Sequence, residues 1–150
     1  MASIRVVVQG VLGKMGHQVL TTLCDEEGLE PVGAVDLFAD TNSIELPDGL
    51  GSVPLSTSIE GSLANADVVV DFTNAEGALS VMREAAPAGV HAVIGSTGHQ
   101  DAAYEEAAAL AEKHGTGIFI APNFALGAVL MIHLAKEAAR FFEYADLTEM

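Results

Sequence analysis

Short apolar runs rich in β-branched residues alternate with longer amphipathic or alanine-rich segments along almost the whole chain. The apolar runs predict strands over Ile4–Val8, Pro31–Val35, Val53–Leu55, Asp67–Phe72, His91–Ile94 and Gly117–Ile120. The segments between them predict helices over Met15–Glu27, Ser58–Ala64, 75–86, an alanine-rich stretch ending at His114, and Leu126–Phe142. This alternation predicts one α/β domain over residues 1–150 with a parallel sheet. The sheet is expected to be doubly wound, because right-handed crossovers favour that arrangement.

Several residues predict where these elements begin and end. Thr73–Glu76 and Thr97–Gln100 match the capping-box pattern, so the first residue of each is expected to cap the helix that follows. Gly115 is expected to end the alanine-rich helix. Residues 38–51 are polar and rich in turn-forming residues, which predicts a mobile loop.

Three glycines stand between the first predicted strand and the first predicted helix. Gly10 permits a tight turn with positive φ, Gly13 has no Cβ to block a pyrophosphate, and Gly16 allows close packing of the helix. The N-terminus of the helix would present free N–H groups and a partial positive charge to an anion. This context favours a Rossmann-type dinucleotide site over the alternative, a purely structural turn.

Asp36 ends the second predicted strand, 20 residues beyond Gly16. A carboxylate at this spacing can accept hydrogen bonds from the adenosine ribose hydroxyls, although it could also simply cap a loop. It would repel a 2′-phosphate, and Leu37 supplies no compensating charge. We therefore predict that NADH is the preferred cofactor. Lys14, in the same glycine turn, keeps NADPH possible.

Two further loops follow predicted strands, where open α/β sheets bind their ligands. Gly95–Gly98 offers flexible backbone and hydroxyl groups to the nicotinamide end of the cofactor. Ala121–Phe124 includes Asn123, whose amide could bond a carboxamide. Turn chemistry and helix capping are the alternative interpretation of both loops.

Composition narrows the class of protein. Six Lys and Arg against 21 Asp and Glu give a net charge of −15, which argues against nucleic acid or anionic lipid as a partner. No apolar run approaches the roughly 18 residues of a membrane span, and no secretory signal is visible, so we expect a cytoplasmic protein. Cys24 is the only cysteine, which leaves no framework for a disulfide or a metal site.

Taken together, these motifs resemble a known family, 4-hydroxy-tetrahydrodipicolinate reductase of the lysine (diaminopimelate) pathway. The matching segments, in the family's order, are Val8–Gly16, Asp71–Thr73, Gly95–Gly98 and Ala121–Phe124. The resemblance implies that a nicotinamide cofactor donates hydride to a cyclic unsaturated dicarboxylate. It implies cofactor contacts at Gly10, Val11, Leu12, Gly13, Lys14, Met15, Asp36, Phe72, Gly95, Ser96, Thr97, Ala121, Pro122, Asn123 and Phe124.

The chain also departs from the family. Ala125 and Val129 stand where serine and asparagine are usual, and the family's second domain, with its paired histidine and lysine motif, is expected to be absent. Residues 144–150 resemble the lead-in to that motif. Among the scattered histidines His99 alone adjoins a cofactor loop, where helix capping is the expected role. No catalytic residue is therefore assigned.

Because the residues that would bind the hydride acceptor are incomplete, we expect a chain that binds cofactor but reduces the substrate slowly or not at all. A high mean hydropathy of +0.37 predicts homo-oligomers formed through the final helix or a sheet edge. The alternatives are a non-catalytic dinucleotide-binding module, acting as a redox sensor or completed by a partner chain, and a different two-domain dehydrogenase with the same nucleotide domain.

Overall fold

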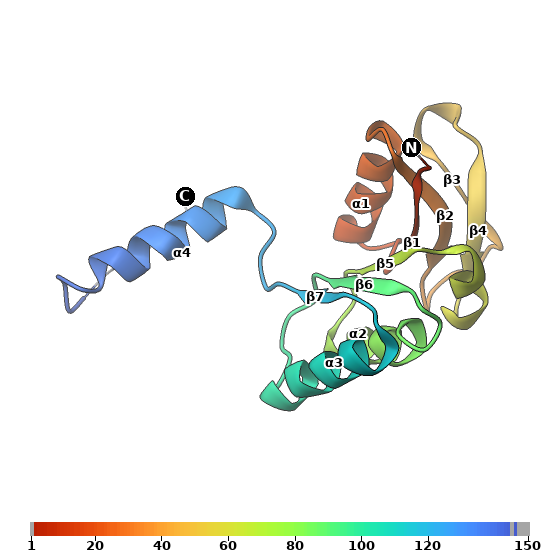
Figure 1. Ribbon diagram of the computed structural model, residues 1–150. Coiled ribbons are helices and arrows are strands. Elements are labelled where there is room, and N and C mark those ends of the chain that lie inside the picture. Colours follow the sequence, from red (N-terminus) through yellow and green to blue (C-terminus); the bar gives the residue numbers. More distant parts are fainter. Residues whose placement is uncertain (1, 145, 147–150) are drawn as a thin grey trace.

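A seven-stranded sheet forms the centre of the computed structural model, which describes residues 2–144 and 146 (Figure 1). Its strands are β1 (Ile4–Gln9), β2 (Leu29–Val35), β3 (Ser43–Glu45), β4 (Ser52–Ser56), β5 (Val68–Asp71), β6 (His91–Ile94) and β7 (Ile118–Ile120). Their order across the sheet is β3-β4-β2-β1-β5-β6-β7. Every described pair of neighbours is parallel except β3 with β4. The doubly wound α/β prediction is confirmed.

Three helices cover the sheet on its two faces, namely α1 (Lys14–Asp25), α2 (Ala75–Ala85) and α3 (Asp101–His114). The chain also forms α4 (Leu126–Ala138) and the short 3-10 turns η1 (Pro47–Gly49) and η2 (Glu60–Asn65). Figure 1 shows α1 on one face of the sheet and α2 with α3 on the other. The crossovers therefore change face between β1 and β5, which makes the carboxyl ends of these two strands the topological switch point.

Strand β1 is buried on both faces, as its continuous run of valines predicts. Successive side chains of a strand point to opposite faces, so Val7 belongs to the core cluster beneath α2 while Val6 and Val8 pack in the cluster beneath α1. All three valines are at most 3% exposed. Two-sided burial is the reason why the apolar positions of this strand do not alternate with polar ones.

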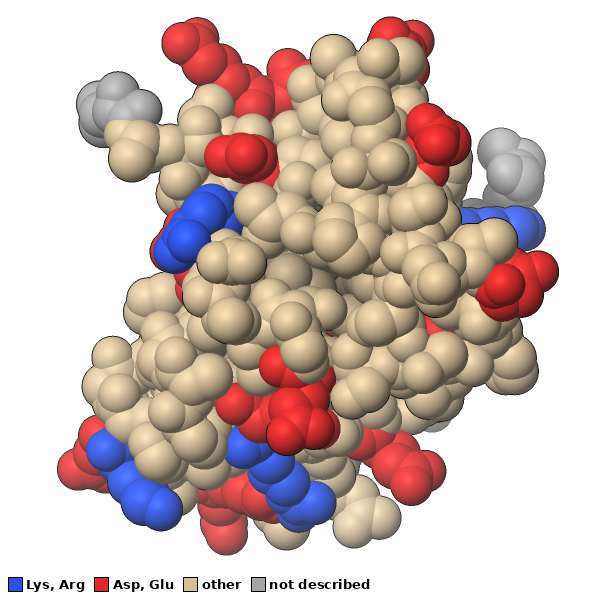
Figure 2. Space-filling model, turned by 90° about the vertical axis from the view of Figure 1, so that its right-hand side faces the viewer, with Lys and Arg blue, Asp and Glu red and all other residues tan. Residues whose placement is uncertain are grey.

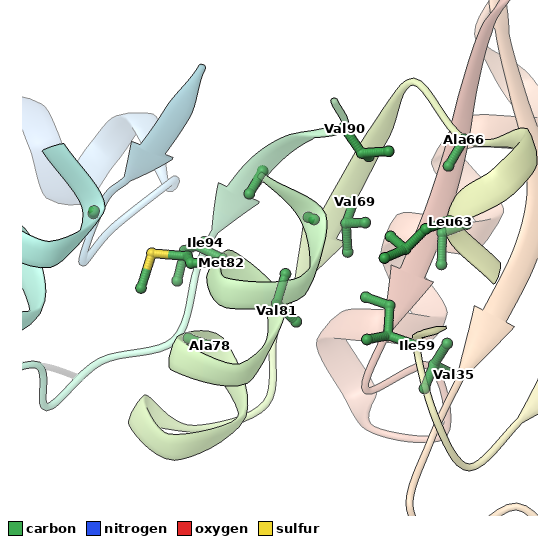
Figure 3. Packing of buried hydrophobic residues seen from close by; sticks show 14 residues of the cluster. Val35, Ile59, Leu63, Ala66, Val69, Ala78, Val81, Met82, Val90 and Ile94 are labelled. Atoms are coloured by element: carbon green, nitrogen blue, oxygen red, sulfur yellow. The ribbon is translucent and has the colours of Figure 1, made fainter. Parts of the chain in front are cut away.

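The core beneath α2 joins helix and sheet (Figure 3). Ala78, Val81 and Met82 lie on one face of α2 and pack in the same cluster as Val69 of β5 and Ile94 of β6. Their spacing of three and four residues places them on the side of the helix that meets the sheet. This packing fixes the ends of β5 and β6, where the predicted site begins.

The predicted loop over residues 38–51 contains regular structure. Ser43–Glu45 forms β3, which pairs antiparallel with β4 at the edge of the sheet, and Pro47–Gly49 forms η1. Three residues with one apolar position are too few to give a strand signal in the sequence. The expectation of a loop without a strand was therefore wrong, and the sheet is mixed rather than wholly parallel.

Both predicted capping boxes are wrong in detail. Asn74, not Thr73, is the N-cap of α2, and its side chain accepts hydrogen bonds from the amides of Glu76 at 3.1 Å and Gly77 at 2.9 Å. The N-cap of α3 is Gln100, whose side chain makes no capping bond. Gly115 does end α3 in the left-handed conformation, with φ of +66°. The predicted helix over 58–64 is the 3-10 turn η2.

Helix α4 stands away from the rest of the molecule (Figure 1). It ends at Ala138 rather than near Phe142. Large apolar side chains along it are 42–82% exposed, namely Leu126, Val129, Leu130, Met131, Ile132 and Leu134. In the part of the chain described, no helix has the length and apolar character needed to cross a membrane. Of the predicted lead-in at 144–150, residues 145 and 147–150 lie outside the described residues.

Candidate functional site at the carboxyl edge of the sheet

The glycine turn has the backbone geometry that its sequence predicts. Gly10 has φ of +79°, and its carbonyl oxygen accepts a 3.1 Å hydrogen bond from the amide of Gly13. A Cβ on Gly16 would overlap that same carbonyl oxygen, so only glycine allows α1 to start this close to the turn. A Cβ on Gly13 would meet only Gly10 O within 4 Å, at 3.2 Å. The backbone at Gly13 is therefore open to a ligand.

The N-terminus of α1 fits an anionic group. Gly13 is the N-cap and has no side chain to occupy the first free amides of the helix. The first turn consists of Lys14, Met15, Gly16 and His17, none of which is acidic. The helix dipole and Lys14 therefore supply local positive potential in a molecule of net charge −15.

Basic side chains elsewhere on the described surface are dispersed. On the face shown in Figure 2, acidic side chains are spread widely and basic side chains lie at separate places. All three arginines are engaged in ion pairs, Arg5 with Asp67 at 2.8 Å, Arg83 with Glu106 at 2.5 Å and Arg140 with Glu137 at 3.0 Å. A phosphate would therefore be recognised by backbone dipoles rather than by a broad basic patch.

Asp36 lies beside the glycine turn, directly after β2, and is only 8% exposed. Its Oδ2 accepts a 3.0 Å hydrogen bond from the amide of Leu12, and its Oδ1 accepts a 3.1 Å bond from the amide of Phe38. The predicted proximity to the turn is confirmed. The alternative role as a loop cap is also fulfilled, because the Phe38 bond closes the loop after β2. Each carboxylate oxygen keeps a second lone pair for a sugar hydroxyl.

The loop after β5 meets the glycine turn. A Cβ on Gly10 would lie 2.9 Å from Cγ2 of Thr73 and 3.2 Å from the carbonyl oxygen of Phe72. Any larger residue at position 10 would push these two loops apart. The glycine turn and the segment Asp71–Thr73 are therefore packed against each other at the switch point.

Phe72 connects the remaining two loops to this edge. A Cβ on Gly95 would overlap the Phe72 ring, so the backbone after β6 runs directly against it. The Phe72 ring also packs against Phe124, with ring centroids 5.6 Å apart and planes tilted by 59°. Phe119 of β7 packs edge-on against Phe124 at 6.1 Å. Four motifs from distant parts of the chain thus form one continuous surface.

The other predicted residues differ in accessibility. Ser96 is 5% exposed, Val11 is fully buried and Ala121 is half-buried. The remaining predicted contacts are exposed at the edge, namely Leu12, Gly13, Lys14, Met15, Thr97, Pro122, Asn123 and Phe124. Val11, whose amide donates to the carbonyl oxygen of Val35, and Ser96 are therefore almost inaccessible to a ligand in this conformation.

His99 does not cap α3. Its Nε2 lies 3.0 Å from the carbonyl oxygen of Ser96 and 3.3 Å from Ser96 Oγ, and its ring stands edge-on to Tyr104 at 6.0 Å. The expectation of helix capping was wrong because the Gly95–Gly98 loop folds back over the histidine. The contact between His99 and Ser96 stabilises the conformation of this loop.

Asp71 is a residue that sequence reasoning did not select for the site. It is fully buried at the end of β5, and its Oδ1 accepts a 2.7 Å hydrogen bond from the hydroxyl of Thr73. Burial raises the pKa of Asp71, while the hydrogen bond from Thr73 and the nearby Ser96 and His99 oppose that rise. A carboxylate following three valines was the available signal.

A hollow of about 690 Å³ lies at the opposite edge of the sheet, at the amino ends of the strands. It is lined by the starts of β1, β2 and β4 and by the end of α1, including Arg5, Glu30 and Cys24. Parallel α/β sheets bind ligands at the carboxyl ends of their strands, so this hollow is not at the edge where a ligand site is expected. Within residues 2–144 and 146, no three His, Cys, Asp or Glu side chains are grouped as metal ligands.

A family model described as dihydrodipicolinate reductase, N-terminus, matches residues 4–124, which include all four motifs of this edge. The chain belongs to the dihydrodipicolinate reductase family. The family resemblance inferred from the motifs is confirmed.

Relatives named 4-hydroxy-tetrahydrodipicolinate reductase match the whole chain. The 4-hydroxy-tetrahydrodipicolinate reductase of Dehalococcoides mccartyi is 47% identical over 152 residues, which is 100% of this chain and 58% of the relative. The protein of the same name from Desulfitobacterium hafniense is 40% identical over 157 residues, with the same coverage. The chain thus spans less than two thirds of the length of these relatives.

Solved structures give the same picture. A dipicolinate-bound dihydrodipicolinate reductase from Paenisporosarcina sp. TG-14 superposes with a TM-score of 0.78 at 29% identity, covering 98% of this chain and 62% of that one. A homoserine dehydrogenase from S. aureus superposes with a TM-score of 0.67 at 14% identity, covering 81% of this chain and 33% of that one. The second likeness concerns the fold alone.

Proposed function

We propose that this chain is the cofactor-binding part of a 4-hydroxy-tetrahydrodipicolinate reductase and binds a nicotinamide dinucleotide along the carboxyl edge of its sheet. The observation that supports this most is the hydrogen bond from the Leu12 amide to Asp36, because it brings the ribose-binding candidate to the glycine turn. The continuous packing from Gly10 through Phe72 to Phe124 extends that surface toward β7.

In the proposed complex the diphosphate lies at the N-terminus of α1, against the open backbone of Gly13 and near Lys14. Asp36 accepts hydrogen bonds from the adenosine ribose. The nicotinamide end lies over the loops that follow β5, β6 and β7. The proposed contacts there are Phe72, Gly95, Ser96, Thr97, Ala121, Pro122, Asn123 and Phe124.

NADH is the proposed preference. The Asp36 carboxylate is held in place by two backbone amides, so it cannot easily turn away from a 2′-phosphate. Leu37 and Phe38, which follow it, are 78% and 86% exposed and offer no positive charge. A 2′-phosphate would therefore meet a fixed negative charge, which lowers affinity for NADPH through electrostatic repulsion.

The bound nicotinamide supplies the hydride. This chain's own residues hold the donor: α1 and the glycine turn bind the diphosphate, and the edge around Phe72 and Phe124 excludes water from one side of the ring. The proposed acceptor is the cyclic dicarboxylate that the relatives' name indicates. The groups that bind it and protonate it are not among the residues assigned here, so we propose slow or no turnover by this chain alone.

Two measurements test the proposal. Calorimetric titration of the folded chain with NADH and NADPH should show binding of both, with the lower Kd for NADH. A steady-state assay with the family substrate should show turnover far below that of a full-length relative. Failure of either coenzyme to bind would overturn the proposed function, and binding with turnover like that of the relatives would overturn the proposed incompleteness.

We also propose that the chain associates with copies of itself through α4, whose apolar side chains are exposed along its length. The cytoplasmic location stays a prediction from composition.

A further inference from the structure

A buried carboxyl group stands where the loops of the proposed nicotinamide site converge. Asp71 ends β5, and the strand register places it beside Gln9 of β1 and Ile94 of β6. It follows Val68, Val69 and Val70, so an apolar residue would continue the strand at less cost. Among the described residues, its Oδ2 is buried without a hydrogen-bond partner. An ionisable group in such a place lowers stability and calls for a reason.

The neighbours of Asp71 belong to the two loops on either side of it. Thr73, which donates its 2.7 Å hydrogen bond to Oδ1, also places its methyl group against Gly10. Gly95, in the loop after β6, donates a 2.8 Å hydrogen bond from its amide to the backbone carbonyl oxygen of Asp71. Asp71 is therefore joined to the loop after β5 through its side chain and to the loop after β6 through its backbone.

We infer that Asp71 is a positioning residue that holds these two loops at the separation needed to bind the nicotinamide half of the dinucleotide. The inference rests on the proposed function. Asp71 itself is too deeply buried to touch the cofactor, so its side chain acts through Thr73. Loops fixed before binding lose less conformational freedom when the ligand arrives, which favours affinity.

The inference predicts different effects on the binding of the two halves of the cofactor. ADP-ribose contains the adenosine and the diphosphate, which lie at Asp36 and α1 in the proposed complex, but lacks the nicotinamide. Loss of the Asp71 hydrogen bonds should therefore weaken NADH and leave ADP-ribose unaffected. A merely structural role would weaken both ligands by the same factor, because the whole edge would be disturbed.

The test is calorimetric titration of NADH and ADP-ribose into the unmodified chain and three variants. Asp71→Leu keeps the branching of the side chain but accepts no hydrogen bond, and we expect it to raise the Kd of NADH about tenfold. The Kd of ADP-ribose should change less than about twofold. Asp71→Asn keeps an acceptor for Thr73 and should restore most of the NADH affinity. Thr73→Val removes the same hydrogen bond from an exposed position, so it should also raise the Kd of NADH about tenfold. This variant therefore tests the inference even where Asp71→Leu folds poorly.

Thr22→Val is the matched control, because Thr22 is an exposed threonine of α1 whose hydroxyl donates to the carbonyl of Gln18. It should change neither Kd. Equal changes for NADH and ADP-ribose in Thr73→Val, or no change in either, would overturn the inference while leaving the proposed function intact. An unmodified chain that binds neither ligand would instead overturn the proposed function, and this inference with it.

Discussion

The amide of Leu12 donates a 3.0 Å hydrogen bond to Oδ2 of Asp36, which joins the glycine turn after β1 to the end of β2. The two residues are 24 positions apart in the chain. The bond fixes the orientation of the carboxylate, so in the proposed complex a sugar hydroxyl would meet an acceptor that is already in position. The proposal therefore makes the affinity for the cofactor depend on a side chain that is only 8% exposed.

Replacing Asp36 should change the choice of cofactor. Asp36→Ala removes the acceptor for the ribose and for the Leu12 amide, and we expect the Kd of NADH to rise about tenfold. The Kd of NADPH should rise less, because the repulsion of the 2′-phosphate disappears at the same time. Parallel titrations with both coenzymes measure the ratio.

Asp40→Ala is the control for this change, since Asp40 is an exposed aspartate of the same loop. It should leave both Kd values and their ratio unaltered. If Asp36→Ala weakened NADH and NADPH by an equal factor, Asp36 would support the turn without discriminating between the coenzymes.

Gly16 is expected to tolerate no side chain. In Gly16→Ala the new methyl group would overlap the carbonyl oxygen of Gly10, which is backbone and cannot rotate away. We expect a loss of at least about 2 kcal/mol in the free energy of unfolding, together with weaker NADH binding. Denaturant unfolding measures the first and titration the second.

Gly61→Ala provides the comparison, because a Cβ at Gly61 would meet nothing within 4 Å. Its stability should stay within about 0.5 kcal/mol of the unmodified chain. Similar losses in both variants would show that the close approach of α1 to the turn is not rigid.

The stability of the chain should reflect the buried charge of Asp71. Burial holds the pKa of Asp71 above its ordinary value, so the unfolded chain loses this proton first as pH rises. Stability is therefore lost as pH rises through the folded-state pKa. Asp71→Asn, which is neutral at every pH, should raise Tm at pH 7 by about 2–4 °C, which corresponds to about 1 kcal/mol.

Thermal unfolding of both proteins over a range of pH checks this. The advantage of Asp71→Asn should shrink on acidification, because the native carboxyl then becomes neutral too. A variant that is less stable than the unmodified chain at pH 7, with a deficit that narrows in acid, would mean that the charged form is stabilised in the fold and would contradict this prediction.

Asp67 should show the opposite dependence on pH. Arg5 donates hydrogen bonds to its carboxylate from both the side chain and the backbone, and these lower the pKa of Asp67 to about 2. Stability from this pair is present above the ordinary pKa of 3.8 and is lost as pH falls toward about 2. The effect should be small, because the two side chains are 44% and 40% exposed.

Asp67→Asn should accordingly lower Tm slightly at neutral pH. The difference from the unmodified chain should narrow between about pH 4 and about pH 2, and it should also narrow at high salt. A difference that is constant over this range would show that the ion pair contributes nothing.

The exposed apolar side chains of α4 should cause self-association. Leu130 and Leu134 are 53% and 58% exposed on this helix. Leu130→Glu should shift the mass measured by light scattering toward the monomer, because a charge opposes burial of the helix against another copy. Ala108→Glu, which adds the same charge at an exposed site of α3, should not. A monomeric unmodified chain at high concentration would contradict this prediction.

Much of the site could be predicted from the sequence because its signals are local. The apolar run of β1, the glycines that follow it and the aspartate after β2 each express a backbone requirement of a few neighbouring residues. The same holds for six of the seven strands and for the left-handed end of α3 at Gly115. The periodicity of apolar residues, the glycines that end elements and the spacing of motifs were therefore sufficient to predict the α/β class and the edge of the sheet where ligands are expected.

Other features depend on contacts between distant segments, which no local pattern expresses. β3 exists because β4 offers three residues of antiparallel pairing, and Thr73 bonds to a buried carboxylate instead of capping α2. The packing of Phe72 against Gly95 and Phe124 likewise arises only when three strands end side by side. The sequence by itself determined the elements and the glycine turn that is proposed to bind an anion, because these follow from backbone preferences. Only the tertiary structure decided which polar groups share one hydrogen-bond network, because burial and competing partners are set by the fold.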